Sequence, residues 1–310
     1  MATDHILATL DVPCAQRPRM AIFRTLSDYW ALTKPEVNFL IVVTTFVGFY
    51  LGSGGQWRDF PFLLCLHAVS GTLLVASGTG ALNQFIERRY DAQMRRTARR
   101  PLAAGRLQPS AVLWFGIALS VIGVVYLAVA VNSLASLLAA FTLLSYLFFY
   151  TPFKRKTPLC TLIGAVPGAM PPLIGYAAAA GKLNFEAWIL YSALFFWQFP
   201  HFMAIAWMYR EDYDRAGYLV LPRDGKTRPL FVNFQTLFPL LALVLLSLLI
   251  ILTRHSSLLC TAALLLTIGF FYYGGRFVFT KSGSAARQLL AASIVYLPAL
   301  FILMIVVRPK

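Results

Sequence analysis

Residues 62–102 read FLLCLHAVSGTLLVASGTGAL and then NQFIERRYDAQMRRTARRPL. The first part, residues 62–82, has one basic side chain, His67, and no acidic one. About 20 apolar residues are enough for a helix to cross the hydrocarbon core of a bilayer. The second part opens with an amide and two carboxylates spaced four residues apart, and it continues with a series of arginines. The whole stretch predicts a membrane-spanning helix that ends in a charged site at the membrane surface.

The rest of the chain has the same apolar character. Of its 310 residues, 59% are hydrophobic and only 13% are charged, and the mean hydropathy is +0.69. Soluble domains have about 25% charged residues, so the sequence predicts an integral membrane protein. The net charge is +15, but the arginines lie between apolar runs, which argues against nucleic acid as a partner. The four cysteines form no CxxC pair, so we expect isolated thiols.

Apolar runs long enough to span a bilayer occur throughout the chain. They predict an all-α, polytopic membrane protein with about nine transmembrane helices. The expected spans are residues 37–53, 61–86, 110–130, 133–151, 159–180, 186–209, 230–253, 257–276 and 288–307. Glycines and prolines at residues 164–172 should interrupt the fifth span, either for close helix packing or to make room for a flat ligand. We divide the chain into an N-terminal segment, residues 1–34, and one transmembrane domain, residues 35–310.

Lysine and arginine set the expected orientation, because they accumulate on the cytoplasmic side of membrane proteins. With the N-terminus in the cytoplasm, 22 of the 27 lysines and arginines lie on that side, and the C-terminus lies outside. Residues 1–34 lack the apolar core of a secretory signal, and their aspartates and few serines argue against a mitochondrial transit peptide. We therefore expect a multi-pass protein of a bacterial cytoplasmic (inner) membrane.

The polar residues after Leu82 are the first candidate site. If the second span continues as a helix, Asn83, Glu87 and Asp91 share one of its faces. Two close carboxylates repel each other unless a cation or proton intervenes. Mg²⁺ suits this face, because it is often held by one or two carboxylates together with substrate phosphates, which the arginines at 95–100 would also bind. The alternative is a solvated helix end with local ion pairs.

Two further segments on the same side favour a phosphate site. Glu211, Asp212 and Asp214 repeat the acidic cluster after the sixth span, and the two loops share a Tyr-Asp pair that hints at a duplicated four-helix unit. Two facing acidic helix ends that each hold Mg²⁺ would form a site for a diphosphate. Residues 154–156, Lys-Arg-Lys, either anchor the topology or neutralise a departing diphosphate.

Five short segments also carry a resemblance to known proteins. They are Leu32-Thr33-Lys34-Pro35; Asn83, Glu87 and Asp91 with Met94, Thr97 and Arg100-Pro101-Leu102; Lys154-Arg155-Lys156-Thr157-Pro158; Pro200-His201-Phe202; and Arg210-Glu211-Asp212-Tyr213 with Ala216-Gly217 and Leu221-Pro222. Together they resemble the UbiA-type intramembrane prenyltransferases. That family's usual first motif has aspartates where this sequence has Gln84 and Glu87. The departure is similar to the heme-modifying branch rather than the quinone or chlorophyll branches.

The resemblance implies a UbiA-like helical bundle and a prenyl transfer reaction. For the heme branch it implies that the farnesyl group of farnesyl diphosphate is transferred to a vinyl group of heme b, giving heme O. It implies Mg²⁺ as the cofactor, the lipid bilayer as the surroundings, and a heme A-forming enzyme as a candidate partner. Two other functions stay open: a prenyltransferase for a quinone precursor or chlorophyllide, and a carrier for an anionic metabolite or heme. A carrier is less favoured, because the charge lies at one interface rather than at the midplane.

The resemblance also implies roles for individual residues. The implied catalytic residues are Asn83, Glu87, Asp91 and Asp212. The implied metal ligands are Glu87, Asp91, Glu211 and Asp212, with Asp212 as the first choice in the second cluster. The implied diphosphate-binding residues are Arg96, Arg100, Lys154, Arg155 and Arg210. The ring candidates for stabilising a farnesyl cation are Tyr150, Trp197 and Phe199. His201 would contact the heme, the diphosphate, or a backbone carbonyl that Pro200 leaves free.

Overall fold

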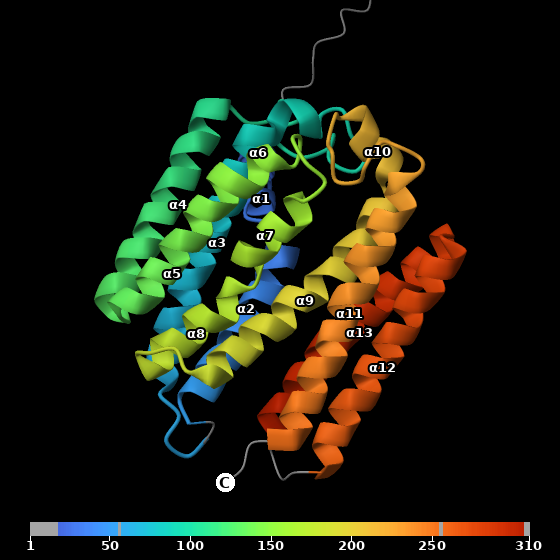
Figure 1. Ribbon diagram of the computed structural model, residues 1–310. Coiled ribbons are helices and arrows are strands. Elements are labelled where there is room, and N and C mark those ends of the chain that lie inside the picture. Colours follow the sequence, from blue (N-terminus) through green and yellow to red (C-terminus); the bar gives the residue numbers. More distant parts are fainter. Residues whose placement is uncertain (1–17, 55–56, 254–256, 307–310) are drawn as a thin grey trace, which may run out of the picture.

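The structure, a computed structural model, describes residues 18–54, 57–253 and 257–306 (Figure 1). These ranges contain helices and turns and no strand. The first helices are α1 (Pro18–Leu32), α2 (Pro35–Gly52), α3 (Phe62–Asp91), α4 (Pro109–Ala130), α5 (Ser133–Leu144), the π-helix η1 (Ser145–Tyr150) and α6 (Thr151–Phe153). The others are α7 (Cys160–Gly168), α8 (Met170–Ala180), α9 (Phe185–Met208), α10 (Arg210–Arg215), α11 (Thr227–Thr253), α12 (Ser257–Thr280) and α13 (Gly283–Val306).

Within the described ranges, nine segments are long and apolar enough to cross a membrane, which confirms the predicted fold class. Four of the nine spans combine or shorten helices: α5 to α6 form one span, α7 and α8 form another, the α11 span ends at Leu249, and the α12 span begins at Thr261. The observed boundaries of the spans differ most from the predicted ones where charged residues in the sequence suggested a loop. The second span extends to Asp91 rather than 86, and the last begins at Gly283 rather than 288.

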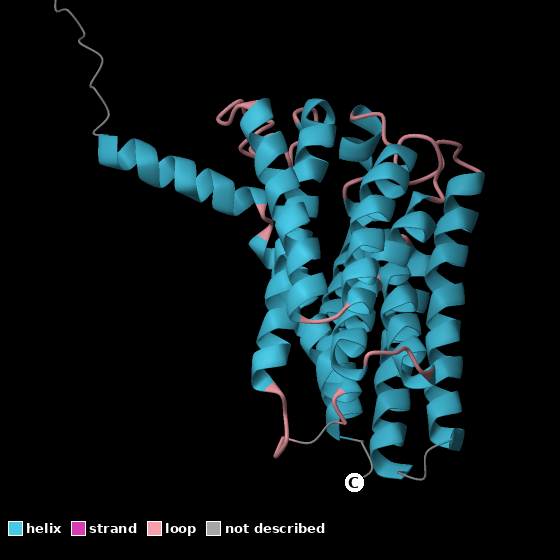
Figure 2. Cartoon of the chain, turned by 90° about the vertical axis from the view of Figure 1, so that its left-hand side faces the viewer, coloured by secondary structure: helices cyan, strands magenta, loops and turns pink. Residues whose placement is uncertain are grey.

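The spans lie side by side, and the short helices α6 and α10 lie at the same end of the bundle (Figure 1). We call this the charged end; its connections are residues 92–108, 154–159 and 209–226. Helix α1 leaves the bundle near this end and runs across its axis (Figure 2). Two buried amides fix the joint between α1 and α2: Gln84 Nε2 donates to Leu32 O at 3.0 Å, and Asn38 Nδ2 donates to Thr33 O at 2.7 Å.

The fifth span is interrupted where the sequence predicted a break. Helix α7 ends at Gly168, Ala169 is a single turn residue whose amide still donates to Ala165 O at 3.1 Å, and α8 starts at Met170 with two prolines in its first turn. This span is the most buried of those described, with 72% of its apolar window inside the protein. Close packing is therefore the reading of residues 164–172 that the fold favours over room for a flat ligand.

Helix α8 packs backbone against backbone on α2. A Cβ atom at Gly48 would overlap the carbonyl of Pro172, and a Cβ atom at Gly175 would overlap the carbonyl of Thr45. Each helix thus places a glycine where the other helix approaches most closely. This contact sets the position of α2, and the start of α2 in turn places Lys34 at the charged end.

The fourth span contains, one turn before its end, a π-helix that the sequence did not predict. Residues 145–150 form η1, which leads directly into α6. Thr151 Oγ1 donates to Tyr146 O at 2.9 Å and accepts from Asn83 Nδ2 at 3.3 Å. Single π-turns inside α-helices occur often at functional sites. Here the π-turn brings residues 150–154 against the end of α3.

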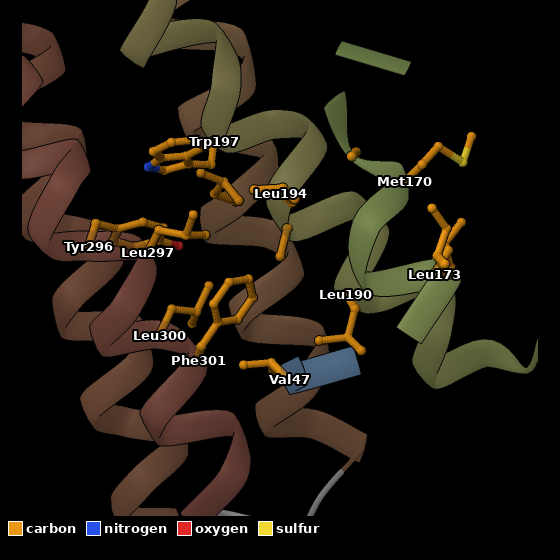
Figure 3. Close-up of a cluster of buried hydrophobic side chains, with 14 of the residues drawn as sticks. Val47, Met170, Leu173, Leu190, Leu194, Trp197, Tyr296, Leu297, Leu300 and Phe301 are labelled. Atoms are coloured by element: carbon orange, nitrogen blue, oxygen red, sulfur yellow. The ribbon is translucent and has the colours of Figure 1, made fainter. Parts of the chain in front are cut away.

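The apolar core lies between the helices at mid-bundle. Figure 3 shows Trp197 and Leu194 of α9 opposite Tyr296, Leu297 and Phe301 of α13, with α2 and α8 on the far side. Many large apolar side chains are instead exposed on the spans, as on Val129 of α4 at 83% and Phe279 of α12 at 86%. A surface of this kind suits hydrocarbon rather than water.

Candidate functional site

The last three turns of α3 carry the first acidic cluster, and all of its members are buried. Asn83, Glu87 and Asp91 are exposed by only 1%, 5% and 1%. The helix continues unbroken to Asp91, so these residues share a face as predicted. Asn83 Nδ2 donates to Glu87 Oε2 at 2.9 Å. The alternative of a solvated helix end is wrong, because this face points into the protein.

Glu87 is paired with a lysine that lies 67 residues away in the sequence. Lys154, directly after α6, donates from Nζ to Glu87 Oε1 at 2.9 Å and to Oε2 at 3.1 Å. Burial alone would lower the pKa of Lys154, but the Glu87 carboxylate outweighs it and holds that pKa well above its ordinary value. Lys154 is therefore a fixed positive charge beside the carboxylate.

Asp91 is paired within the loop that follows α3. Arg100 Nη1 donates to Asp91 Oδ2 at 2.7 Å, and Thr97 Oγ1 donates to Asp91 O at 2.8 Å. The loop therefore folds back over the helix end, and it brings a guanidinium into the site. Of the predicted arginines, Arg100 enters the acidic cluster directly, while Arg96 is exposed beside it.

Lys34 is a member of this site that the sequence analysis did not assign. Its Nζ donates to Asn83 Oδ1 at 2.8 Å, so the Asn83 amide is held from both sides. Burial, together with the positive charges of Arg100 and Lys154, lowers the pKa of Lys34 from its ordinary value to about 7. The signal in the sequence was the Leu32-Thr33-Lys34-Pro35 segment, which carried resemblance but suggested no role.

The second acidic cluster lies on α10, a short helix that starts after α9 ends at Met208. Asp212 is buried, whereas Glu211 and Asp214 are exposed. Asp212 Oδ1 meets Arg215 Nη1 at 3.4 Å, within the same turn of helix. The fold therefore favours Asp212 over its two acidic neighbours as a functional carboxylate.

Several cations join the loops of the charged end. The Arg96 guanidinium lies 5.2 Å from the ring centre of Tyr209 and donates to the Tyr213 hydroxyl at 3.2 Å. Arg155 stacks on Tyr90 at 4.1 Å. These contacts bring residues 92–108 and 154–159 against the ends of α3 and α10. Arg210 is different, because it turns back and donates to Trp207 O at 2.9 Å.

Another unassigned residue, Tyr218, lies among these loops. It is only 3% exposed, and its hydroxyl makes no hydrogen bond within the described part of the chain. Burial raises the pKa of the Tyr218 hydroxyl, and the negative charge of Glu87 raises it further. The sequence offered no signal for this residue, since an isolated tyrosine in a loop has no pattern.

The donor set of the charged end fits Mg²⁺ chemically. No three acidic, histidine or cysteine side chains converge on one point in the described residues, so Glu87, Asp91 and Asp212 do not form a closed protein cage. Mg²⁺ does not need one, because it keeps several waters and uses one or two carboxylates together with phosphate oxygens. All the available donors here are hard oxygens.

The residues predicted to contact an apolar substrate lie in two separate places. The ring of Tyr150 lies 4.5 Å from Lys154 Nζ and so belongs to the charged end. Trp197 and His201 stack at 4.6 Å in the contact between α9 and α13. Trp197 Nε1 donates to Ser293 O and His201 Nδ1 pairs with Ser293 Oγ, both at 2.8 Å. His201 therefore bonds a hydroxyl rather than a carbonyl that Pro200 frees.

Comparison with known proteins covers almost the whole chain. Residues 41–304 match the model of the UbiA prenyltransferase family. A protoheme IX farnesyltransferase of Koribacter versatilis is 41% identical over 302 residues, which are 94% of this chain and 96% of that protein. A protoheme IX farnesyltransferase of Solibacter usitatus is 53% identical over 203 residues, which are 64% of this chain and 70% of that protein.

Solved structures share the fold at low sequence identity. A digeranylgeranylglyceryl phosphate synthase aligns with a TM-score of 0.72 at 18% identity, over 91% of this chain and 98% of that one. A UbiA homologue from Archaeoglobus fulgidus bound to GPP and Mg²⁺ aligns with a TM-score of 0.60 at 14% identity, over 89% of this chain and 99% of that one. The helical bundle described above is therefore a known fold.

Proposed function

This chain belongs to the UbiA prenyltransferase family, and we propose that it transfers the farnesyl group of farnesyl diphosphate to a vinyl group of heme b, giving heme O and diphosphate. One observation carries the proposal. Buried carboxylates and cations meet at one end of an apolar helical bundle, where Lys154 is bonded to Glu87 and Arg100 to Asp91. The name of the Koribacter versatilis relative, which spans nearly the whole chain, supports heme as the acceptor.

The reaction balances with water as the third reactant. The bond between the first farnesyl carbon and its oxygen breaks, and its electron pair leaves with the diphosphate. The vinyl π-electrons of heme b then form the new carbon–carbon bond with the farnesyl cation. Water adds to the resulting cation on the heme side and loses a proton to solvent, which leaves the hydroxyl group of heme O.

The cations of the charged end would stabilise the leaving diphosphate. Lys154 and Arg100 already lie within hydrogen-bond distance of carboxylates, and Lys34 lies beside them. Preformed charges of this kind stabilise developing negative charge without first having to reorganise. Arg96, Arg155 and Arg210 stay candidates at the rim, with Arg210 the least favoured because it turns back on Trp207.

We propose Glu87, Asp91 and Asp212 as the residues that would hold Mg²⁺, with Asn83 orienting Glu87. When bound, Mg²⁺ would neutralise charge on the diphosphate. A relative in fold, the Archaeoglobus fulgidus protein, is bound to GPP and Mg²⁺, which supports a metal in this role. Glu211 is exposed, so we rank it below Asp212 as a candidate metal ligand.

The apolar bundle would protect the farnesyl cation from water. Tyr150 lies closest to the charged end and is the ring that we assign to the cation. Trp197 and Phe199 are also buried, but they lie within α9. In the sequence they are further than Tyr150 from Lys154, Arg100 and the carboxylates that these two residues pair with. His201 keeps its second ring nitrogen free of the Ser293 bond, and we propose that it contacts heme.

We place the charged end on the cytoplasmic side of a bacterial inner membrane, because most lysines and arginines lie on the loops of that side. Farnesyl diphosphate would then reach the site from the cytoplasm. The product is more apolar than heme b and would stay in the bilayer. A heme A-forming enzyme in the same membrane is the partner that would take it up.

The test is chromatography of heme extracts after purified protein is incubated with heme b and farnesyl diphosphate, with Mg²⁺ or with a chelator. We expect a later-eluting heme with the mass of the hydroxyfarnesyl group only when metal is present. Asp91→Ala should lower its formation by about 100-fold or more. The matched control is Asp59→Ala, which removes an exposed aspartate at the opposite end of the bundle.

Other outcomes would point elsewhere. Full turnover by Asp91→Ala at normal expression would remove the first acidic cluster from the reaction. A folded protein that binds farnesyl diphosphate and makes no new heme would have another acceptor, such as a quinone precursor. A protein that does not bind the diphosphate, but moves a labelled anion across a vesicle membrane, would be a carrier.

A further inference from the structure

Tyr218 is held at the meeting point of the three loops of the charged end. Gly217 takes a positive φ of 73°, which turns the chain sharply after α10. The turn is closed by the Tyr218 amide, which donates to Tyr213 O at 2.9 Å. The next amide, that of Leu219, donates to Lys154 O at 2.7 Å. The backbone of Tyr218 is therefore tied to the loop that carries the central lysine.

The ring of Tyr218 is enclosed on several sides. It packs with Met94 and Ala216 in a small apolar cluster, and it meets the rings of Tyr90 and Tyr213 edge to face at 6.1 Å. Tyr90 directly precedes Asp91, so this cluster lies against the first acidic segment. Its packing fixes the direction of the Tyr218 side chain as well as its position.

The three tyrosines of this cluster differ in what their hydroxyl groups contact. The Tyr90 hydroxyl accepts from Arg155, and the Tyr213 hydroxyl accepts from Arg96. The Tyr218 hydroxyl is the most deeply buried of these and makes no hydrogen bond among the described residues. A buried hydroxyl group without a partner is unfavourable. It indicates that the partner is a molecule that arrives later.

The Glu87 carboxylate lies close enough to the Tyr218 hydroxyl to raise its pKa, but no hydrogen bond of normal geometry joins the two groups. Glu87 Oε1 accepts from Lys154, and Glu87 Oε2 accepts from Lys154 and from Asn83. These bonds occupy three of the about four acceptor positions of the carboxylate, and the Tyr218 hydroxyl does not take the remaining one. The phenol is a donor that stays neutral and protonated at physiological pH. The acceptor that suits this donor is therefore an oxygen of an anionic ligand that binds among the surrounding cations.

We propose that Tyr218 binds the prenyl diphosphate, donating a hydrogen bond from its hydroxyl group to a diphosphate oxygen. The inference rests on the proposed function, since it names a further contact of the same substrate. Lys154 and Lys34 attract the diphosphate as point charges, which have little directional preference. A neutral donor on a rigid ring adds direction, and it fixes which oxygen faces the second acidic loop.

The test replaces the hydroxyl group and keeps the ring. Tyr218→Phe and wild type are compared for calorimetric affinity for inorganic pyrophosphate with Mg²⁺, for KM of farnesyl diphosphate, and for Tm. We expect the pyrophosphate affinity to fall about tenfold, because a hydrogen bond to a charged group is lost. The KM for farnesyl diphosphate should rise by a similar factor. The Tm should stay equal or rise, because the free protein loses no hydrogen bond.

Tyr296→Phe is the matched control. Tyr296 is as buried as Tyr218, but its hydroxyl pairs with Thr267 Oγ1 at 3.1 Å on the other side of the bundle. Its loss should lower the Tm and leave the pyrophosphate affinity unchanged. The two variants should therefore show opposite patterns.

Three results would overturn the inference. Unchanged pyrophosphate affinity in Tyr218→Phe, with wild type binding normally, would overturn the Tyr218 contact alone. A lower Tm or loss of folding in Tyr218→Phe would mean that the hydroxyl has a partner within the protein. Wild-type protein that does not bind pyrophosphate at all would overturn this contact together with the proposed function.

Discussion

The acidic end of α3 and the acidic helix α10 lie at the same end of the bundle, but they obtain their counter-charges in different ways. Glu87 and Asp91 are almost fully buried. The partner of Glu87 comes from the loop that follows another span, 67 residues away, and the partner of Asp91 comes from a loop that folds back over the helix. The positions of these charges are therefore fixed by the tertiary fold.

The carboxylates of the α10 cluster pair with arginines that lie closer to them in the sequence. Asp212 meets Arg215 in the same turn of helix at 3.4 Å, and Asp214 meets Arg228 at the same distance. Glu211 and Asp214 are exposed. Pairs of this kind contribute little to stability and rearrange easily. The comparison indicates that the first cluster is preformed, whereas the second is able to adjust when a diphosphate binds.

Lys154→Met should give the largest effect, because it removes the fixed counter-charge of the first cluster. An uncompensated buried carboxylate would destabilise the protein by about 3 kcal/mol. Loss of the charge beside the leaving group should lower heme O formation by about 1000-fold. Thermal unfolding in detergent and chromatography of heme extracts measure the two effects.

A double variant separates the two roles of Lys154. Lys154→Met combined with Glu87→Gln should recover most of the stability, because the unpaired charge is gone. It should recover none of the activity. If Lys154→Met alone keeps the wild-type Tm, the first cluster is no more rigid than the second, and the comparison fails.

Asp212→Asn should reduce activity strongly and stability hardly at all. Its partner is a local arginine, so the free energy of unfolding should change by less than about 1 kcal/mol. Heme O formation should fall by about 100-fold, because a carboxylate that we propose as a Mg²⁺ ligand is lost. Heme chromatography and thermal unfolding are compared in the same preparation.

Glu211→Gln and Asp214→Asn are the controls for Asp212. Both residues are exposed, so each variant should stay within about twofold of wild-type activity. A larger loss in Glu211→Gln than in Asp212→Asn would mean that the helix turns a different face to the substrate. The second cluster would then be less ordered than the structure indicates.

The sequence predicted the first cluster better than the second for a physical reason. Asn83, Glu87 and Asp91 lie on one continuous helix, and helical spacing alone places them on a common face. Glu211, Asp212 and Asp214 follow the end of α9 and lie on a separate short helix. The position of that helix depends on the hydrogen bond from Arg96 to Tyr213, whose partners lie 117 residues apart, and no local pattern contains such a contact.

Contacts between residues far apart in the sequence explain why the sequence predicted neither the pairing of Lys154 with Glu87 nor the place of Lys34 in the site. The pairing of Lys154 with Glu87 depends on the π-turn η1, which arises in the fold and has no signature in residues 145–150. Lys34 reaches Asn83 because buried amides fix the joint before α2. The sequence did predict the nine spans and the break in the fifth, because those features depend on local hydrophobicity and on proline.

Lys34→Arg should give the smallest effect, and one that depends on pH. Lys34 bonds Asn83 of the first cluster, and its pKa is about 7. Below this pKa the amine is charged and assists diphosphate binding; above it the free protein has lost that charge. Wild-type affinity for farnesyl diphosphate should therefore fall as pH rises, whereas arginine stays charged throughout.

The quantity to measure is the affinity of wild type for farnesyl diphosphate divided by that of Lys34→Arg. Titration of the diphosphate itself affects both proteins equally and cancels in this ratio. When binding restores one proton to Lys34, the wild-type affinity falls by up to about tenfold per pH unit above 7, relative to Lys34→Arg. Calorimetry at pH 8 in buffers of different ionisation enthalpy should detect this proton uptake in wild type and not in the variant. A constant ratio from pH 6 to pH 8.5 would mean that Lys34 keeps its charge, and that the preformed cluster contains one more fixed cation.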